Sequence, residues 1–245
     1  MQRYFKDTNL DIFDLSSDDS YHIIKVMRNN IGDKVEVVID KCLYICEIIN
    51  IDNLVTVKRL EGVKCDSELP CYVTIAQSLV KEQKMDLILQ KSCELGVSEI
   101  IPINATRSIV KLDKKESKKI ERWNKILKEA SEQSKRVVIP RVNEIMDIKE
   151  LANLDYDIKI LCTVNELSTS LKNVLSKDLN NLKILLVIGP EGGFTDNEEK
   201  ILIDKGFIST SFGRRVLRTE TASLYALSII NYILIFIAIL IFNFI

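Results

Sequence analysis

The sequence predicts an α/β protein whose C-terminal part contains a mainly parallel β-sheet and whose N-terminal part is a smaller, β-rich domain. From residue 71 onwards, apolar runs typical of strands alternate with segments of helical spacing, the pattern of parallel α/β sheets. Before residue 68, short runs rich in Val and Ile follow one another with only turns between them. A chain of 245 residues, 47% apolar and 28% charged, is long enough for both parts to form globular cores.

The N-terminal part is predicted to contain three consecutive strands, at residues 32–40, 44–52 and 54–60. Turn residues separate these runs, and closely spaced short strands are typical of a small barrel or sandwich. The segment CDSELP, residues 65–70, has the composition of a linker and ends in a proline. We therefore expect two domains, residues 1–68 and 71–245.

The C-terminal part is predicted to alternate strands and helices along its whole length. We expect strands at residues 72–80, 97–103, 158–164 and 183–189, and helices at residues 85–95, about 115–135, 167–179 and 196–206. No charged residue follows Glu220, and residues 232–242 form the unbroken apolar run YILIFIAILIF. That run is shorter than the roughly 20 residues of a membrane-spanning helix. We favour a buried terminal helix or a dimer interface over a membrane-anchored tail.

The charge balance excludes a protein that binds nucleic acid through its overall field. Lys plus Arg number 34 against 35 Asp plus Glu, so an RNA partner needs a local basic surface. Residues 107–136 contain 11 basic and 5 acidic side chains, and they form either a solvated helix or a phosphate-contacting surface. The six cysteines form no CxxC pair and the single histidine is remote from them, so no metal site is expected. The N-terminus lacks an apolar leader, which favours a cytoplasmic location.

The stretch GPEGG, residues 189–193, holds three of the eight glycines in the chain. It follows a buried-strand pattern, and Thr195 with Glu198 after it predicts a capping box at the start of a helix. Ligands bind at this edge of open α/β sheets, and glycine lets the backbone approach them closely. The stretch matches neither GxGxxG nor the P-loop pattern, and its central Glu191 favours a ligand with donors or positive charge over phosphate. A simple tight turn is the alternative.

A second glycine-containing loop, FGRRVLRTETA at residues 212–222, also precedes a predicted apolar helix. Alone, its arginines indicate no more than a solvated turn, and Thr219 and Glu220 are ordinary residues at a helix start. Two such loops close together in the sequence can, however, line a single pocket.

Several stretches together resemble the RsmE family, whose members are small-subunit ribosomal RNA uridine-N3 methyltransferases of the SPOUT superfamily. The similarity runs in order from residue 1 to about 231 and includes MQRYF, HIIKVMRNNIGDKVEV, KSCELGV, EASEQSKR, GPEGGF and LRTETA. It implies an N-terminal PUA-like β-barrel that binds RNA and a C-terminal SPOUT α/β domain with a deep trefoil knot, one of the rare exceptions to unknotted topology. It also implies a homodimer that holds S-adenosylmethionine in the knot. The apolar run after residue 231 departs from the family pattern.

The resemblance also assigns residues. The implied cofactor-binding residues are Ile188, Gly189, Pro190, Gly192, Gly193, Val216, Leu217, Arg218, Thr219 and Ala222. The implied RNA-binding residues are Arg3, His22, Lys25, Arg28, Arg107 and Arg136, and Glu94, Glu132 and Gln133 match positions near the RNA-facing side. The segment CTVNEL, residues 162–167, matches a position at the edge of the pocket loosely.

Methyl transfer needs no metal, since the sulfonium already supplies a good leaving group and the protein mainly aligns the reactants. Uridine N3 must lose a proton, so we hypothesise that Arg218 or a neighbouring arginine stabilises the uracil anion and that Glu191 or Glu220 positions groups or accepts the proton. A purely structural Glu191, which caps its own loop, is the alternative. The main alternative is a non-catalytic RNA-binding protein that keeps the fold. A nucleotide-dependent hydrolase or dehydrogenase is disfavoured because both nucleotide-binding motifs are missing.

Overall fold

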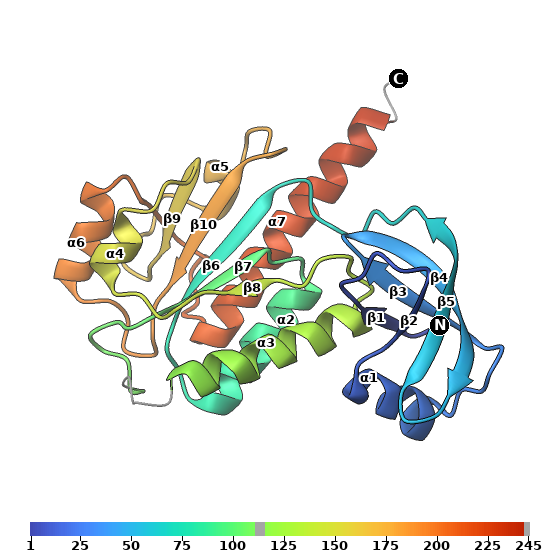
Figure 1. The fold of residues 1–245 in the computed structure, drawn as a ribbon. Coiled ribbons are helices and arrows are strands. Elements are labelled where there is room, and N and C mark those ends of the chain that lie inside the picture. The colour runs from blue at the N-terminus through green and yellow to red at the C-terminus, as the bar shows by residue number, and fades with distance from the viewer. Residues whose placement is uncertain (111–115, 243–245) are drawn as a thin grey trace. The chain divides into compact units, whose positions relative to one another are not determined.

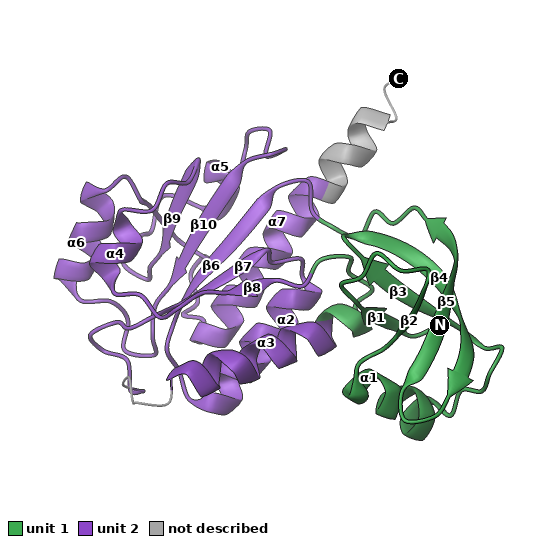
Figure 2. Cartoon of the chain, viewed as in Figure 1, with its two compact units in different colours: residues 1–68, 131–138 green, residues 69–130, 139–245 purple. Residues whose placement is uncertain are grey.

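The computed structural model describes residues 1–110 and 116–242, and in the last helix it describes side chains as far as Leu234. The chain divides into two compact units, coloured separately in Figure 2. Unit 1 comprises residues 1–68 and 131–138, and unit 2 comprises residues 69–130 and 139–245. The short segment 131–138 thus belongs to unit 1, although it is far in sequence from the other residues of that unit.

Unit 1 contains one β-sheet and a short helical segment (Figure 1). Its elements are β1 (Arg3–Phe5), β2 (Ile12–Asp14), α1 (Ser17–Tyr21), the π-helix η1 (His22–Met27), β3 (Lys34–Ile39), β4 (Cys42–Ile51) and β5 (Val55–Val63). The sheet order is β1-β3-β4-β5-β2, in which only the β1–β3 pair is parallel. The three predicted strands are confirmed, each within a few residues of its expected ends.

The core of unit 1 follows from the alternation along these strands. Val35 and Val37 of β3 lie on the same side as Val55 and Val57 of β5, and all four are buried in one apolar cluster. Tyr4 of β1 belongs to the same cluster, so the N-terminal strand is fixed by packing as well as by its pairing with β3.

Unit 2 contains a six-stranded sheet flanked by helices. Its elements are β6 (Tyr72–Ser78), α2 (Glu82–Glu94), β7 (Glu99–Ile103), α3 (Glu116–Gln133, whose end lies in unit 1), β8 (Arg141–Val142), α4 (Ile148–Ala152), β9 (Ile158–Cys162), α5 (Leu171–Val174), β10 (Lys183–Ile188), α6 (Asp196–Asp204), β11 (Ile208–Thr210) and α7 (Thr219–Phe242). The order is β11-β9-β10-β6-β7-β8, and every pair is parallel. The predicted mainly parallel α/β sheet is confirmed.

Both faces of this sheet are covered, which explains the continuous apolar runs of its central strands. In β10, Ile184 and Leu186 pack into the cluster that contains α2, α3 and α7, whereas Leu185 and Val187 pack into the cluster of α4 and α6. Figure 1 shows these two helical layers on opposite sides of the sheet.

The helix predicted at residues 167–179 is wrong, because only Leu171–Val174 is helical. Polar side chains bind the local backbone instead. The carboxylate of Glu166 accepts from the backbone N–H groups of Ser168 and Thr169, and the Ser176 hydroxyl donates to the carbonyl of Asn173. Hydrogen bonds of this kind compete with helix formation on both sides of the short helix.

The last helix, α7, extends into the apolar run that begins at Tyr232. Its first half packs on the sheet through Ala226, Leu227 and Ile230, all fully buried. The side chains of residues 235–245, on which the expected packing of the apolar tail depends, lie outside the described residues. No helix in the part of the chain that the structure describes is long and apolar enough to span a membrane.

Candidate functional site

A cavity of about 510 Å³ lies in unit 2, at the C-terminal ends of β9, β10 and β11. Three loops form its wall: residues 162–167 after β9, residues 188–194 after β10 and residues 211–219 before α7. This is the edge at which ligands bind in open parallel sheets. All ten residues expected to bind a cofactor line the cavity: Ile188, Gly189, Pro190, Gly192, Gly193, Val216, Leu217, Arg218, Thr219 and Ala222.

The GPEGG loop connects β10 to α6 and has the conformation expected of its glycines. Gly193 has a φ of 67°, in the left-handed region that side chains disfavour. A Cβ at Gly189 would lie 3.2 Å from the ring of Phe194, so the ring packs against bare backbone. The predicted capping box is confirmed: the Thr195 hydroxyl accepts from the N–H of Glu198, whose carboxylate accepts from the N–H of Thr195. The loop is therefore firmly anchored at its exit.

Arg107, which is expected to contact RNA, forms part of the cavity wall. Its guanidinium donates to the carbonyls of Gly192 and Phe194, each at 3.1 Å. The neighbouring Thr106 donates its N–H and its hydroxyl to the buried carboxylate of Glu198, at 2.8 and 3.0 Å. The loop that carries Arg107 is thus tied both to the GPEGG loop and to the start of α6.

The pKa of Glu198 reflects this anchoring. Burial raises it, but the hydrogen bonds from the backbone and hydroxyl groups of Thr195 and Thr106 outweigh burial, so the net pKa lies below its ordinary value. The carboxylate is therefore ionised at neutral pH and accepts four hydrogen bonds from two separate segments.

The second loop contributes Arg218 and Thr219, which play different parts. The Thr219 hydroxyl donates to the carbonyl of Gly189 at 2.7 Å and so connects the two loops directly. Arg218 is exposed and lines the cavity, and its guanidinium forms no hydrogen bond or ion pair within the described part of the chain. It is available to a ligand, as the hypothesis for Arg218 requires.

Glu191 and Glu220 share a partner that the sequence did not reveal. Lys84, in the first turn of α2, lies with its Nζ 2.9 Å from Oε1 of Glu191 and 3.4 Å from Oε2 of Glu220. Burial raises the pKa of Glu191. This effect is outweighed by the hydrogen bond from Lys84, a backbone hydrogen bond and the charges of Lys84 and Lys81, so the net pKa lies below its ordinary value. Glu191 lines the cavity, whereas Glu220 is not among its lining residues.

A second acidic group on the wall also escaped sequence analysis. Glu199 of α6 accepts from the Thr163 hydroxyl at 2.6 Å and from the Asn165 amide at 3.2 Å, and all three residues line the cavity. The Glu199 carboxylate of α6 thus holds the loosely matched segment after β9 at the cavity. Thr163 and Asn165 directly follow a strand, which is the signal that the sequence offers for this contact, but Glu199 lies 36 positions away from Thr163.

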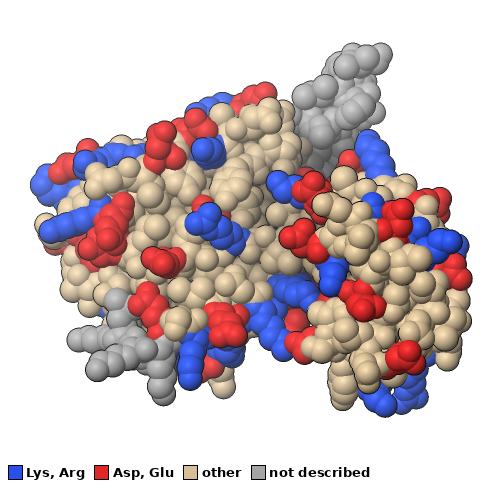
Figure 3. Space-filling model, in the orientation of Figure 1, with Lys and Arg blue, Asp and Glu red and all other residues tan. Residues whose placement is uncertain are grey.

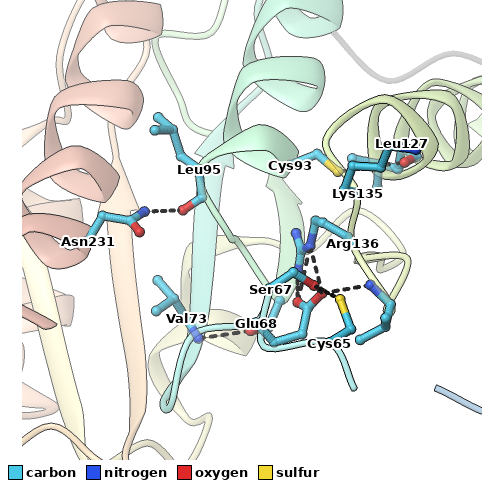
Figure 4. Close-up of polar contacts among 12 residues, drawn as sticks. Cys65, Ser67, Glu68, Val73, Cys93, Leu95, Leu127, Lys135, Arg136 and Asn231 are labelled. Atoms are coloured by element: carbon cyan, nitrogen blue, oxygen red, sulfur yellow. Dashed lines mark hydrogen bonds and ion pairs between the residues drawn. The ribbon is translucent and has the colours of Figure 1, made fainter. Parts of the chain in front are cut away.

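Two of the residues expected to bind RNA, Arg3 and Arg136, are buried inside unit 1. The Arg3 guanidinium donates to Glu36 at 2.9 Å and to the carbonyls of Lys135 and Arg136. Arg136 forms an ion pair with Glu68, 2.6 Å from Nη2 to Oε2, in the cluster that Figure 4 shows. Each side chain is only 4% exposed. We therefore assign Arg3 and Arg136 an internal role that holds segment 131–138 to the rest of the unit.

The other expected RNA contacts in unit 1 lie on or beside η1. Lys25 and Arg28 are exposed, whereas His22 is half-buried and its Nδ1 lies 3.0 Å from the hydroxyl of Tyr4. Of the remaining positions, Glu94 and Gln133 are exposed and Glu132 is buried. On the face that Figure 3 shows, basic and acidic side chains are interspersed.

The basic tract includes residues 111–115, which lie outside the described residues. In the helix that follows, Arg122 forms ion pairs with Glu82 and Asp86 of α2. Part of this tract thus fixes one helix of unit 2 to another. Among the described residues, no group of three or more His, Cys, Asp or Glu side chains is arranged to hold a metal ion.

The fold and the cavity define an RNA methyltransferase domain. The sequence model of a family described as the RNA methyltransferase domain matches residues 67–231, which include all three loops of the cavity and the whole six-stranded sheet.

Individual relatives narrow this class. The chain is 39% identical to ribosomal RNA small subunit methyltransferase E of Bacillus subtilis, over 95% of this chain and 96% of that protein. It is 34% identical to ribosomal RNA small subunit methyltransferase E 2 of Borreliella burgdorferi, over 85% and 86% of the two chains. The crystal structure of ribosomal RNA small subunit methyltransferase E from Neisseria gonorrhoeae bound to S-adenosyl methionine superposes with a TM-score of 0.86, at 29% identity, over 95% and 98% of the two chains. The chain belongs to the ribosomal RNA small subunit methyltransferase E family, which confirms the resemblance drawn from the motifs.

Proposed function

We propose that this protein transfers the methyl group of S-adenosylmethionine to N3 of a uridine in small-subunit ribosomal RNA. The observation that carries the proposal is the cavity itself, because the two loops that carry the family motifs meet there and all ten expected cofactor residues line it. The names of the relatives support the reaction class, and the relative from Neisseria gonorrhoeae was solved with S-adenosyl methionine bound.

The cavity fits this cofactor in size and in chemistry. About 510 Å³ is within the range of small-molecule sites. The cofactor carries an ammonium group, a sulfonium and ribose hydroxyls, and the wall offers the carboxylates of Glu191 and Glu199 as well as loop carbonyls. Gly192 and Gly193 leave the backbone accessible to a nucleoside. When bound, the cofactor supplies an activated methyl group with a neutral leaving group.

The residues of the chain align the reactants and stabilise the negative charge that forms on the uracil ring. Arg218 lines the cavity without a described partner, so we assign it to the anion that forms on the uracil ring as N3 loses its proton. Glu191 is a weaker base than an ordinary carboxylate because its pKa is lowered and its oxygen is engaged by Lys84. We therefore propose that Glu191 and Glu220 position the cavity loops through Lys84, and that the N3 proton passes to solvent water.

The finer features of the family are part of the same proposal. We propose that residues 1–68 form a PUA-like RNA-binding barrel, with His22, Lys25 and Arg28 at the RNA, and that residues 71–245 form a SPOUT domain whose strand-to-helix loops at the cavity are knotted. The exposed positions of Lys25 and Arg28 support the first part, and the parallel sheet with both motif loops at one edge supports the second. We further propose that the protein is a cytoplasmic homodimer.

Mapping of N3-methyluridine in small-subunit ribosomal RNA from cells with and without this gene tests the proposal. We expect one modified uridine to be lost in the deletion strain and restored by the wild-type gene. An unchanged modification profile contradicts the assignment.

Calorimetry with purified, folded protein separates the enzyme from a non-catalytic RNA-binding protein of the same fold. We expect saturable binding of S-adenosylmethionine with one site per chain. Folded protein that binds ribosomal RNA but no cofactor would instead favour the non-catalytic alternative.

A further inference from the structure

A buried amide lies directly behind the cavity, on the strand that no family motif singled out. Gln77 belongs to β6 and is fully buried. Gln77 lies on the same face of β6 as Val73 and Ile75, both of which pack on the side of the sheet that α7 covers. A glutamine at such a position costs free energy unless both ends of its amide are hydrogen-bonded.

Both ends are satisfied, by a chain of hydrogen bonds that ends in the GPEGG loop. The Gln77 amide nitrogen donates to the Thr219 hydroxyl at 2.9 Å and to the carbonyl of Ser78 at 3.0 Å. The Thr219 hydroxyl in turn donates to the carbonyl of Gly189 at 2.7 Å. The Gln77 amide oxygen accepts from the Ser223 hydroxyl at 2.5 Å. Thr219 and Ser223 are buried at the start of α7, so one side chain of β6 connects both walls of the cavity.

The direction of every bond in this chain is fixed by elementary chemistry. A backbone carbonyl can only accept, so the Thr219 hydroxyl must use its single proton on Gly189. It can then only accept from Gln77, which places the amide NH₂ group toward Thr219 and the amide oxygen toward Ser223. Neither a carboxylate nor an apolar side chain at position 77 can reproduce both contacts.

We infer that Gln77 is a positioning residue for the methyl-transfer site: it holds the GPEGG loop and the start of α7 in the conformation that binds the cofactor. The inference rests on the proposed function, because it assigns S-adenosylmethionine as the ligand of the cavity. Gln77 itself does not line the cavity, so its effect on the ligand passes through Thr219 and Gly189, which do.

The variant Gln77→Glu tests this with almost no change in shape. An ionised carboxylate still accepts from Ser223 but cannot donate to Thr219 or to the carbonyl of Ser78. Because burial raises the pKa of a carboxyl group at this position, the introduced group regains a donor proton as the pH falls. We expect calorimetry to show S-adenosylmethionine binding about tenfold weaker at pH 8, since loss of the buried hydrogen bond to Thr219, which lines the cavity, costs about 1.4 kcal/mol or more. The loss should shrink toward pH 6.

A matched control separates positioning from general destabilisation. Thr74, on the same strand, is also fully buried, and its hydroxyl contacts Glu99 and Tyr156 on the opposite face, away from the cavity. Thr74→Val should lower the melting temperature while leaving the affinity for S-adenosylmethionine unchanged. Should Gln77→Glu fail to fold, Gln77→Met combined with Thr219→Val in a double-mutant cycle supplies the same comparison, with a non-additive effect on affinity expected.

The outcomes are distinct from those of the proposed function. If the wild-type protein does not bind S-adenosylmethionine, the proposed function fails. If the wild type binds while Gln77→Glu binds equally well at every pH, or Thr74→Val loses as much affinity, only the role of Gln77 is overturned.

Discussion

The family resemblance assigned cofactor-binding residues in unit 2 and RNA-binding residues in unit 1, and the structure places the two sets in different environments. The loop residues of unit 2 were expected around a cofactor, and all ten line one cavity. Arg3 and Arg136 of unit 1 were expected to face RNA, yet both are buried and bonded to carboxylates and carbonyls of their own unit.

The two sets differ in the structural property that has to be predicted. Glycines between a strand and a capping box indicate a backbone conformation, which is a local property and can be predicted from the neighbouring residues. The exposure of an arginine depends on which distant segment packs against it. Here that segment is residues 131–138, more than sixty positions from Glu68 and more than a hundred from Arg3.

The largest effect is expected for Arg218→Ala, which tests whether a cavity arginine is functional where the buried ones are structural. Removing a donor aimed at a developing anion typically lowers turnover by about 10²- to 10³-fold. We expect a loss of this size in single-turnover methylation of small-subunit ribosomal RNA, with little change in melting temperature. Arg141→Ala, which removes an exposed charge from β8, is the control and should methylate normally. Equal rates for the two variants would remove Arg218 from the mechanism.

The next largest effect is expected for Glu68→Ala, which tests the opposite half of the comparison. The substitution leaves the Arg136 guanidinium buried without its carboxylate, and loss of one partner of such a pair costs about 3 kcal/mol. Urea unfolding should show this loss. The affinity of the protein that remains folded for S-adenosylmethionine should be unchanged, because the cavity lies in unit 2. A stability within 0.5 kcal/mol of wild type, roughly the effect of an ordinary surface substitution, would show that the pair is not structural.

The same contrast runs through the whole prediction from sequence. Strand positions and the parallel sheet followed from apolar periodicity. Glycine and capping patterns pointed to the two pocket loops, and the family resemblance assigned their residues to the cofactor. Lys84 could not be found, since nothing near it in the sequence points to a partner 107 positions away. Gln77 was missed for a related reason: within a strand of buried residues, a single glutamine carries no signal until its partners on α7 are known. The length of the short helix α5 was overestimated because the Glu166 carboxylate before it and the Ser176 hydroxyl after it bind the local backbone.

A smaller effect, dependent on pH, is expected for Glu198→Gln. The folded-state pKa of Glu198 is lowered, so its carboxylate stabilises the protein above its ordinary value of 4.5, and this contribution is lost as the pH falls through the folded-state pKa. We expect the variant to be less stable than wild type by about 1 to 2 kcal/mol at pH 7. The two should converge in acid, as measured by urea unfolding from pH 7 to pH 3. A constant difference across that range would mean that the charge of Glu198 contributes nothing.

The smallest effect on stability, and the most direct test of the comparison, is expected for Gly193→Ala. Gly193 has a φ of 67°, and no atom lies within 4 Å of the position that a Cβ would occupy. The substitution therefore clashes with nothing and costs only the strain of the left-handed conformation, about 1 kcal/mol. Because this loop lines the cavity, relaxation of that strain should also weaken S-adenosylmethionine binding measurably.

Gly32 in unit 1 is the matched control, with a φ of 92° and equally open surroundings. Gly32→Ala should cost a similar free energy of unfolding but leave cofactor affinity unchanged. A loss of affinity confined to Gly193→Ala would mean that the glycine of the motif serves the ligand as well as the turn. Equal affinities in the two variants would reduce Gly193 to a turn residue.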